Sequence, residues 1–375
     1  MITPLGAMKL AIEEAQKGLG FVAPNPPVGC VILDQQENLL AKGFHRIFGG
    51  DHAEIDALKQ IKDPAKLNGA TVFVTLEPCA HEGKTGSCAK RLATLPIAKV
   101  VYGLEDPYAE VSGKGLEILK SAGIAIEKSP FLSDELEELP EVFLCNHRHQ
   151  KTFVALKVAT SLDGQMAHIS GESRWITGAE SREYVHYLRA QYDAVLVGKN
   201  TFLKDDPKLN IRNSRFIGKK NKVIILDTDG AASAQLGKSQ IFQEHAPEDI
   251  YVVSINPVAG LPTGVQSLIC KSDSKGFVDL QHLLKVLFEK RIFSIFVEGG
   301  ATVLSEFLQQ GLVHRYYQFI APVIMGAKTG LSFSRDVSIA QLPDRRELRS
   351  VRNLSFGSDI MVTGRLDPHA TIGSH

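Results

Sequence analysis

Residues 71–88 read TVFVTLEPCAHEGKTGSC, an apolar run that leads into Pro78-Cys79 and continues to a second cysteine, Cys88. The run 71–76 is nearly continuous, which is typical of an interior strand covered on both faces. Cys88 is followed by a short helical pattern and is predicted to begin a helix. The stretch therefore predicts a strand, a loop and a helix of an α/β protein, with a cysteine at each end of the loop.

Apolar runs and amphipathic stretches alternate on both sides of this segment. In the first half we expect helices near 6–19, 52–61, 88–95, 113–122 and 133–149, and strands near 28–33, 39–44, 70–76, 99–103 and 124–127. In the second half we expect strands near 153–160, 193–198, 222–227, 250–254, 293–297 and 313–320, and helices near 178–190, 279–290 and 301–310.

Three further patterns refine this outline. Thr177 and Glu180 have the spacing of a capping box, which predicts a helix start there. Residues 229–249 and 256–278 have little periodicity and are expected to be surface loops. The polar run 146–150 precedes a new strand and places a domain boundary near 148–151. We therefore predict two α/β domains, over residues 1–148 and 149–368.

Composition narrows the class of partner. The chain of 375 residues carries 42 basic and 42 acidic side chains, so its formal net charge is zero. This balance argues against nucleic acid or an anionic membrane held by long-range attraction. No apolar run reaches the ~18 residues of a membrane span. We therefore expect small-molecule partners, with no nucleic acid and no membrane, and we also expect a homo-oligomer.

The cysteines and the N-terminus indicate the compartment. Glu13 and Glu14 interrupt the first apolar stretch, so no secretory signal is predicted and the cytoplasm is expected. Five cysteines in such a chain do not form a disulfide framework. Cys30, Cys145 and Cys270 lie beside apolar residues and are expected to be buried.

Cys79 and Cys88 instead belong with His52-Ala53-Glu54, which begins a predicted helix. One imidazole and two thiolates leave the fourth tetrahedral position of Zn²⁺ open to water, as in catalytic zinc sites. Zinc lowers the pKa of its water to roughly 7. Glu54 lies two residues beyond His52, close enough to take a proton from that water and pass it to departing ammonia. His52, Cys79 and Cys88 are thus predicted zinc ligands, and Glu54 the catalytic acid and base.

Two details leave the kind of zinc site open. Zinc deaminases carry His-x-Glu and Pro-Cys-x-x-Cys, whereas the second cysteine here lies nine residues after the first. His81 could also close the metal site as a fourth ligand and make it structural.

The first half resembles the deaminase domain of the bifunctional riboflavin-biosynthesis enzymes. The resemblance is carried by APNPPVGCV (23–31), GFHR (43–46), HAE (52–54) and the long Cys-x8-Cys motif with Gly-Lys-Thr inside it (77–88). It implies a cytidine-deaminase-like α/β/α sandwich with a mixed sheet. It also implies substrate contacts from Asn25, His45, Lys84, Thr85 and Asp106. The chain departs from the family at 106–109, which reads DPYA where the family has DPNP.

The second half resembles the reductase domain of the same family. The motifs are SLDG (161–164), GESRWITG (171–178), LRAQYD (188–193), TFLKDDPKLNIR (201–212) and VEGGAT (297–302). The last is a strand that ends in glycines before a helix, a turn that lets backbone N–H groups approach a phosphate. The chain has no Gly-x-Gly-x-x-Gly fingerprint, so a standard Rossmann domain is not expected. The resemblance implies a dihydrofolate-reductase-like fold instead.

The same resemblance implies the residues of the reductase site. Those expected to bind NADPH are Ala159, Trp175, Thr201, Asp205, Gly300, Ala301 and Thr302. Those expected to bind the ribosyl substrate are Lys157, Ser173, Arg189, Leu209, Arg212 and Glu298. Arg189 and Arg212 suit its 5′-phosphate because a guanidinium binds phosphate bidentately.

The function implied by both halves is sequential. Zinc-dependent hydrolysis would deaminate 2,5-diamino-6-ribosylamino-4(3H)-pyrimidinone 5′-phosphate. NADPH would then reduce the ribosyl group of 5-amino-6-(5-phosphoribosylamino)uracil to ribityl, with one Zn²⁺ per chain. One alternative is a nucleic-acid base deaminase with a non-catalytic C-terminal domain, which should show a basic groove with interleaved aromatics. The other is a binding module in which zinc is structural, Glu54 is idle and the second domain senses a nucleotide.

Overall fold

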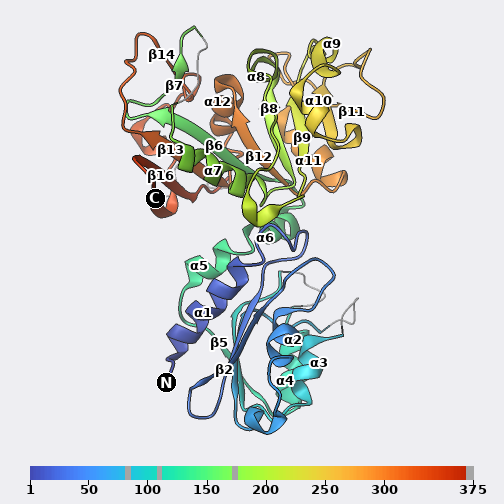
Figure 1. Ribbon diagram of the computed structural model, residues 1–375, viewed down its shortest axis with the longest axis vertical. Coiled ribbons are helices and arrows are strands. Elements are labelled where there is room, and N and C mark those ends of the chain that lie inside the picture. The colour runs from blue at the N-terminus through green and yellow to red at the C-terminus, as the bar shows by residue number, and fades with distance from the viewer. Residues whose placement is uncertain (81–85, 108–111, 171–175, 369–375) are drawn as a thin grey trace. The chain divides into compact units, whose positions relative to one another are not determined.

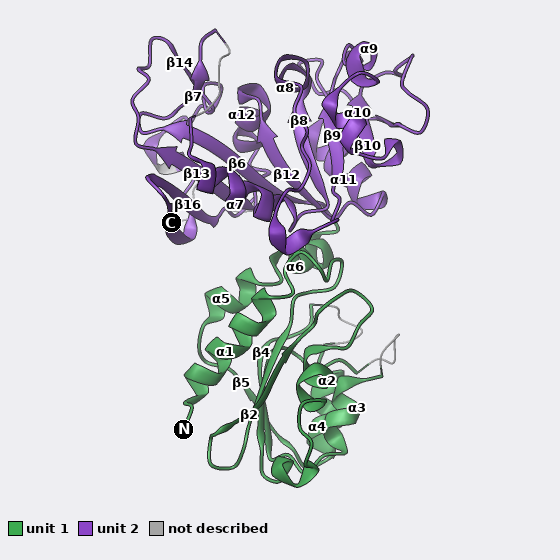
Figure 2. Ribbon diagram, in the orientation of Figure 1, with its two compact units in different colours: residues 1–150 green, residues 151–375 purple. Residues whose placement is uncertain are grey.

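The computed structural model describes residues 1–80, 86–107, 112–170 and 176–368 (Figure 1). The chain divides into two compact units, residues 1–150 and 151–375 (Figure 2). The division follows Gln150, within the interval 148–151 in which the sequence places the boundary. The N-terminal unit ends with α6 (Glu141–His149), and the C-terminal unit begins with β6 (Phe153–Ser161).

The N-terminal unit is built on a five-stranded mixed sheet in the order β2-β1-β3-β4-β5. β1 pairs antiparallel with β2 and β3, whereas β3, β4 and β5 are parallel. The strands are β1 (Gly29–Leu33), β2 (Leu39–Phe44), β3 (Thr71–Leu76), β4 (Lys99–Leu104) and β5 (Ala125–Lys128). The apolar runs near 28–33 and 71–76 thus form interior strands, as expected.

Helices cover both faces of this sheet because successive strand side chains point to opposite sides. Val31, Phe73 and Val101 pack in one cluster with residues of α1 (Pro4–Gln16) and α5 (Ser133–Glu138). The other cluster contains Cys30, Val72 and Val100. It packs with residues of α2 (Ala53–Leu58), α3 (Cys88–Ala93) and α4 (Lys114–Ser121), the group of helices on the opposite face in Figure 1. This is the predicted α/β/α sandwich.

The single helix predicted over 133–149 is wrong. The segment forms two helices, α5 and α6, and Pro140 lies at the N-cap of the second. Proline has no backbone N–H and disfavours helical geometry in the residue before it, so the ladder is interrupted there.

The C-terminal unit contains a nine-stranded sheet in the order β11-β10-β9-β8-β12-β6-β13-β16-β15. It is parallel from β11 to β13, and β16 and β15 then add an antiparallel edge. The strands are β8 (Ala194–Gly198), β9 (Lys222–Leu226), β10 (Ile250–Ser254), β11 (Gln266–Ile269), β12 (Ser294–Gly299), β13 (Arg315–Ala321), β15 (Arg349–Phe356) and β16 (Asp359–Arg365). A separate pair joins β7 (Gln165–His168) and β14 (Gly330–Ser332).

Two buried clusters hold this sheet between helices. Leu156 and Leu196 pack with α11 (Leu280–Glu289) and α12 (Ala301–Gln309) on one face. Val195 and Val223 pack on the other with residues of α8 (Lys199–Asp205), α9 (Ser233–Leu236) and α10 (Gln240–Glu244). The regions 229–249 and 256–278 are therefore more ordered than the predicted loops, since they contain α9, α10 and β11. Short elements of four or five residues carry too little periodicity to be recognised.

The helix start predicted at Thr177–Glu180 is confirmed, but the capping box itself does not form. Helix α7 (Ala179–Arg189) has Gly178 at its N-cap and no side-chain cap from Thr177. Asp359 at the start of β16 performs this task, because its carboxylate accepts from the Gly178 N–H (2.6 Å) and the Ser181 hydroxyl (2.6 Å). A cap from a residue so distant in sequence is invisible to local spacing.

Candidate metal centre and pocket

Three potential metal ligands converge in the N-terminal unit. His52 is the N-cap of α2, Cys79 lies three residues after β3, and Cys88 is the first residue of α3. Their ligand atoms all lie within 4.8 Å of one another. The His52 Nδ1 atom is 3.5 Å from the Cys79 Sγ and 3.3 Å from the Cys88 Sγ. The structure therefore brings together the three residues that the sequence singles out.

These distances fit zinc. Bond lengths of about 2.0 Å to nitrogen and 2.3 Å to sulfur at a tetrahedral angle place the two ligand atoms about 3.5 Å apart. The Cys88 N–H also donates to the Cys79 Sγ (3.4 Å), which favours a thiolate there. A hydrogen bond from Cys88 lowers the pKa of the Cys79 thiol. His81, the alternative fourth ligand, lies outside the described residues.

Glu54 is buried in the first turn of α2, with 3% of its surface exposed. Burial, reinforced by the Cys79 thiolate, raises the pKa of its carboxyl to about 7. A carboxyl with a pKa near neutrality can both accept and return a proton. Glu54 thus has the chemistry of an acid–base group beside the ligand cluster.

His45 and Asn25 form a second polar pair near His52. The His45 Nδ1 lies 2.8 Å from the Asp51 carbonyl oxygen, and its Nε2 lies 3.2 Å from the Asn25 Nδ2. A carbonyl only accepts, so Nδ1 carries the proton and Nε2 accepts from Asn25. The His45 and His52 rings are 5.4 Å apart. Both predicted substrate contacts therefore lie beside the metal ligands.

Glu77 is a functional candidate that the sequence reasoning missed. Its carboxylate, 4% exposed, accepts from the Gly113 N–H (2.8 Å) and the Asp106 N–H (3.4 Å). Gly115 completes this junction, since a Cβ there would lie 1.9 Å from the Pro78 carbonyl oxygen. Glu77, which follows β3 and precedes Cys79 by two residues, therefore links the predicted substrate contact Asp106 and the start of α4 to the loop that carries Cys79.

Replacing Glu77 with Ala is expected to destabilise the N-terminal unit by about 1–3 kcal/mol, because two backbone N–H groups lose their acceptor. Chemical denaturation followed by a probe of that unit measures the change. Glu127→Ala is the matched control, since Glu127 is exposed and pairs with Lys99 at the surface. Equal stability of the two variants would contradict the role given to Glu77.

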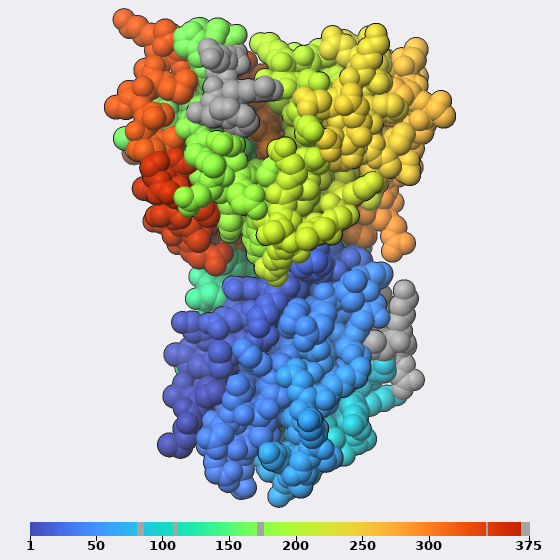
Figure 3. Space-filling model, viewed as in Figure 1, coloured from blue at the N-terminus to red at the C-terminus, as the bar shows by residue number. Residues whose placement is uncertain are grey.

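The C-terminal unit holds a cavity of about 1080 Å³. It opens between the carboxyl ends of β8 and β12 and the helices that follow them, and Figure 3 shows this unit hollowed between its green and yellow-green parts. α8 follows β8 and α12 follows β12, so the N-termini of both helices lie at this cavity. They are close together, because a Cβ on Gly300 would lie 3.0 Å from the Thr201 Oγ1. Helix N-termini present N–H groups suited to phosphate.

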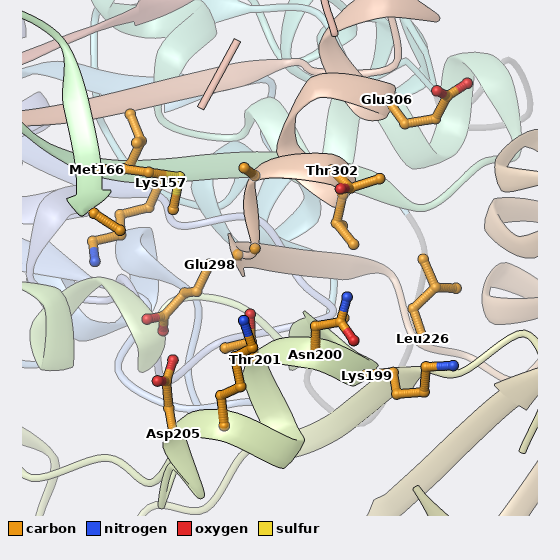
Figure 4. Close-up of a pocket in the computed structure, with 18 of the residues that line it drawn as sticks. Lys157, Met166, Lys199, Asn200, Thr201, Asp205, Leu226, Glu298, Thr302 and Glu306 are labelled. Atoms are coloured by element: carbon orange, nitrogen blue, oxygen red, sulfur yellow. The ribbon is translucent and has the colours of Figure 1, made fainter. Parts of the chain in front are cut away.

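An ion pair is part of the lining of this cavity. Arg189 of α7 binds both carboxylate oxygens of Glu298, through its Nε and, at 3.0 Å, through its Nη2, and both side chains are nearly buried. Lys157 of β6 lies in the same cavity (Figure 4), where burial lowers the pKa of its ammonium and the nearby Glu298 opposes that effect. The site thus combines a neutralised arginine with a lysine that can release a proton.

The predicted reductase residues largely line this cavity. Those that do are Lys157, Ala159, Arg189, Thr201, Asp205, Arg212, Glu298, Gly300, Ala301 and Thr302. Leu209 is buried with a φ of 50° and is not among the lining residues. Ser173 and Trp175, like Lys84 and Thr85 of the first unit, lie outside the described residues. His186 also lines the cavity, and the sequence analysis missed it. It could have been found, because residues three apart share a face of a helix and His186 lies three residues before Arg189.

Both units match known domain families. The family model for the cytidine and deoxycytidylate deaminase zinc-binding region matches residues 3–104, and the one for the RibD C-terminal domain matches residues 152–362. The two units are thus those of a zinc-dependent deaminase joined to a reductase. The predicted α/β architecture of two such domains is confirmed.

The chain belongs to the RibD family of riboflavin biosynthesis proteins. It is 37% identical to riboflavin biosynthesis protein RibD of Aquifex aeolicus, over 95% of this chain and 96% of that protein. It is 36% identical to the Escherichia coli protein, over 85% and 88%. Among solved structures it is similar to a diaminohydroxyphosphoribosylaminopyrimidine deaminase/5-amino-6-(5-phosphoribosylamino)uracil reductase from Thermotoga maritima, with 37% identity, 96% and 98% coverage and a TM-score of 0.83. Acinetobacter baumannii RibD gives 35% identity, the same coverage and a TM-score of 0.81.

Proposed function

We propose that this chain catalyses two consecutive steps of riboflavin biosynthesis, each in its own unit. Deamination and reduction are the activities of the family, and Zn²⁺ and NADPH are its cofactors. The observation that supports the first step most directly is the convergence of His52, Cys79 and Cys88 beside buried Glu54. The substrates are the phosphorylated pyrimidines named above.

In the N-terminal unit, His52, Cys79 and Cys88 would hold zinc. The ion supplies a nucleophile by lowering the pKa of water. Glu54 takes the proton released when the oxygen adds to the amino-bearing carbon. As the C–N bond breaks, Glu54 returns that proton to the departing ammonia. Asn25 offers an amide donor and acceptor to the pyrimidine edge, and His45 fixes its orientation.

In the C-terminal unit, the helix N-termini at Thr201 and Gly300 would hold NADPH, which supplies a hydride to C1′ of the ring-opened ribosylamine. The accepting C=N group also needs one proton to become the amine. Lys157 is placed to provide it from its ammonium, because it lies in the same cavity as Glu298 and Arg189. Arg212 would hold the substrate phosphate.

Lys157→Met is expected to lower the rate of reduction by roughly 10²–10⁴-fold, the range of general acid catalysis. Burial depresses the pKa of Lys157, so the wild-type rate should fall as pH rises through that lowered pKa, when the ammonium deprotonates. The methionine variant should lose this limb. NADPH oxidation followed at 340 nm across alkaline pH measures both effects. An unchanged limb in the variant would assign it to another group.

The experiment that tests the whole function supplies the diaminopyrimidine substrate with NADPH and looks for ammonia and the ribityl product together. Release of ammonia without oxidation of NADPH would contradict the reduction step of the proposal. Matches to both domains do not favour the nucleic-acid base deaminase with an inert C-terminal domain, and tight single-stranded RNA binding at physiological salt would be needed to revive it.

Assembly and location are part of the proposal. No helix in the described ranges has the length and apolarity that a membrane span requires. We place the chain in the cytoplasm as a homo-oligomer, consistent with a biosynthetic enzyme that acts on small phosphorylated pyrimidines. Light scattering on the purified protein tests the oligomer, and a monomer mass would reject it.

A further inference from the structure

Residues 206–213, which we call the anchored segment, follow α8 and contain no helix or strand. Side chains from outside the anchored segment form hydrogen bonds with its backbone carbonyls. Asn221 donates to the Leu209 carbonyl (3.1 Å), and His245 lies 2.8 Å from the Lys208 carbonyl. The Asn210 side chain donates to Glu244 of α10 (2.8 Å). The segment that carries Arg212 is therefore positioned by contacts from outside it.

Helix α7 makes the contacts nearest to Arg212. The Asn210 carbonyl oxygen lies 3.0 Å from the His186 Nδ1 and 2.9 Å from the Arg189 Nη1. The other ring nitrogen of His186, Nε2, faces the Arg212 guanidinium at 3.2 Å from Nη2 and 3.4 Å from Nε. His186 is 8% exposed and, like Arg189 and Arg212, lines the cavity.

These partners determine the protonation of the ring. The Nδ1 atom faces both the Asn210 carbonyl and, at 3.2 Å, the Arg212 backbone N–H, so the other nitrogen decides the tautomer. Because a guanidinium only donates, Nε2 presents a lone pair to Arg212, and the one proton of the neutral ring lies on Nδ1. A second ring proton would place N–H against N–H and add a charge beside two arginines. Burial first, then Arg189 and Arg212, lower the pKa of His186 to about 4, against the opposing hydrogen bond to Asn210 and the charge of Glu298. The ring is neutral at physiological pH.

The two arginines therefore differ in whether a carboxylate compensates their charge. Glu298 neutralises Arg189, whereas among the described residues no ion pair involves Arg212, which is held by an uncharged acceptor. Its full positive charge is available to an anion in the cavity. An acidic partner in the place of His186 would orient the guanidinium equally well but would cancel that charge.

We propose that His186 is a positioning residue that orients Arg212 toward the phosphate of the reductase substrate while leaving its charge uncompensated. The inference rests on the proposed function, in which Arg212 binds that phosphate. It makes His186 a determinant of the preference for a phosphorylated over a dephosphorylated substrate.

Three substitutions separate orientation from charge. Gln can accept from Arg212 and donate to Asn210 without charge, Glu can accept but neutralises, and Leu does neither. We expect His186→Leu and His186→Glu to lower the preference for 5-amino-6-(5-phosphoribosylamino)uracil over its dephosphorylated form by about tenfold, the worth of a hydrogen bond to a charged group. The loss should be mainly in KM, with kcat nearly constant. His186→Gln should stay within about threefold of the wild type.

Arg212→Leu distinguishes failure of this inference from failure of the proposed function. If Arg212→Leu loses the preference while His186→Leu and His186→Glu keep it, the role of His186 is overturned and the phosphate site stands. If Arg212→Leu itself keeps the preference, the assigned phosphate site is wrong. Loss in His186→Gln equal to that in His186→Leu would also overturn the inference. Glu180→Gln, at an exposed position of α7, is the matched control, and thermal unfolding followed by a probe of the C-terminal unit reports the folding of each sample.

Discussion

Glu54→Gln is expected to lower ammonia release by about 10²–10⁴-fold while the protein keeps its zinc. The amide occupies nearly the same volume in the first turn of α2 but cannot carry the proton from water to ammonia. General acid–base groups contribute about this much to rate. Reduction of pre-deaminated substrate by NADPH should persist, because its residues lie in the other unit. Ammonia release, zinc content and 340 nm absorbance measure the three outcomes.

A neighbouring acid on the same helix provides the control. The Asp56 carboxylate accepts from the Phe44 N–H (3.1 Å) and from Arg46 (2.8 Å), not from the ligand cluster. Asp56→Asn should therefore retain ammonia release within severalfold. Native ammonia release by Glu54→Gln would show that another group moves the proton.

Cys88→Ala is expected to abolish zinc binding and bring ammonia release to background. Two remaining ligands do not form the three-ligand set of a catalytic zinc site. Bound metal also stabilises the folded state that binds it, so the N-terminal unit should unfold at a lower temperature. Metal analysis with ammonia release measures the first effects, and thermal unfolding of the purified protein measures the last.

Cys30→Ala is the matched control for the cysteine variant. Cys30 is equally buried in the same unit, but it packs in the apolar cluster beneath the helices and is not one of the three ligands. It should keep zinc and activity while losing some stability to a small cavity. Full zinc content in Cys88→Ala would mean that the metal lies elsewhere, and the deaminase centre would need another ligand set.

The sequence predicted structure and site best where a residue type in its pattern has a single common role. The side chains of the apolar runs in β1 and β3 alternate between two helical layers, so the burial of both strands follows from composition. The ligand set of His52, Cys79 and Cys88 was predicted because imidazole and thiolates at helix starts suit zinc. The reductase residues came from resemblance, since arginines and glycines taken singly have many structural uses.

The sequence did not reveal stabilising contacts between residues that are distant along the chain. The helix predicted over 178–190 forms as α7, but its cap comes from Asp359, 181 positions after Gly178. α9, α10 and β11 were missed because each is too short to show a period. Glu77 lies inside a recognised motif, yet its partners Asp106 and Gly113 are brought to it only by the parallel pairing of β3 with β4.

By itself, the sequence determined the two α/β units, the metal-binding chemistry and the acid beside it, because residue type and spacing carry that information. Only the tertiary structure decided which charges in the cavity are balanced. Arg189 and Arg212 are identical side chains in sequence, but folding places a carboxylate against one and a neutral imidazole against the other. Electrostatic pairing depends on distance in space, and distance between remote segments is set by the fold.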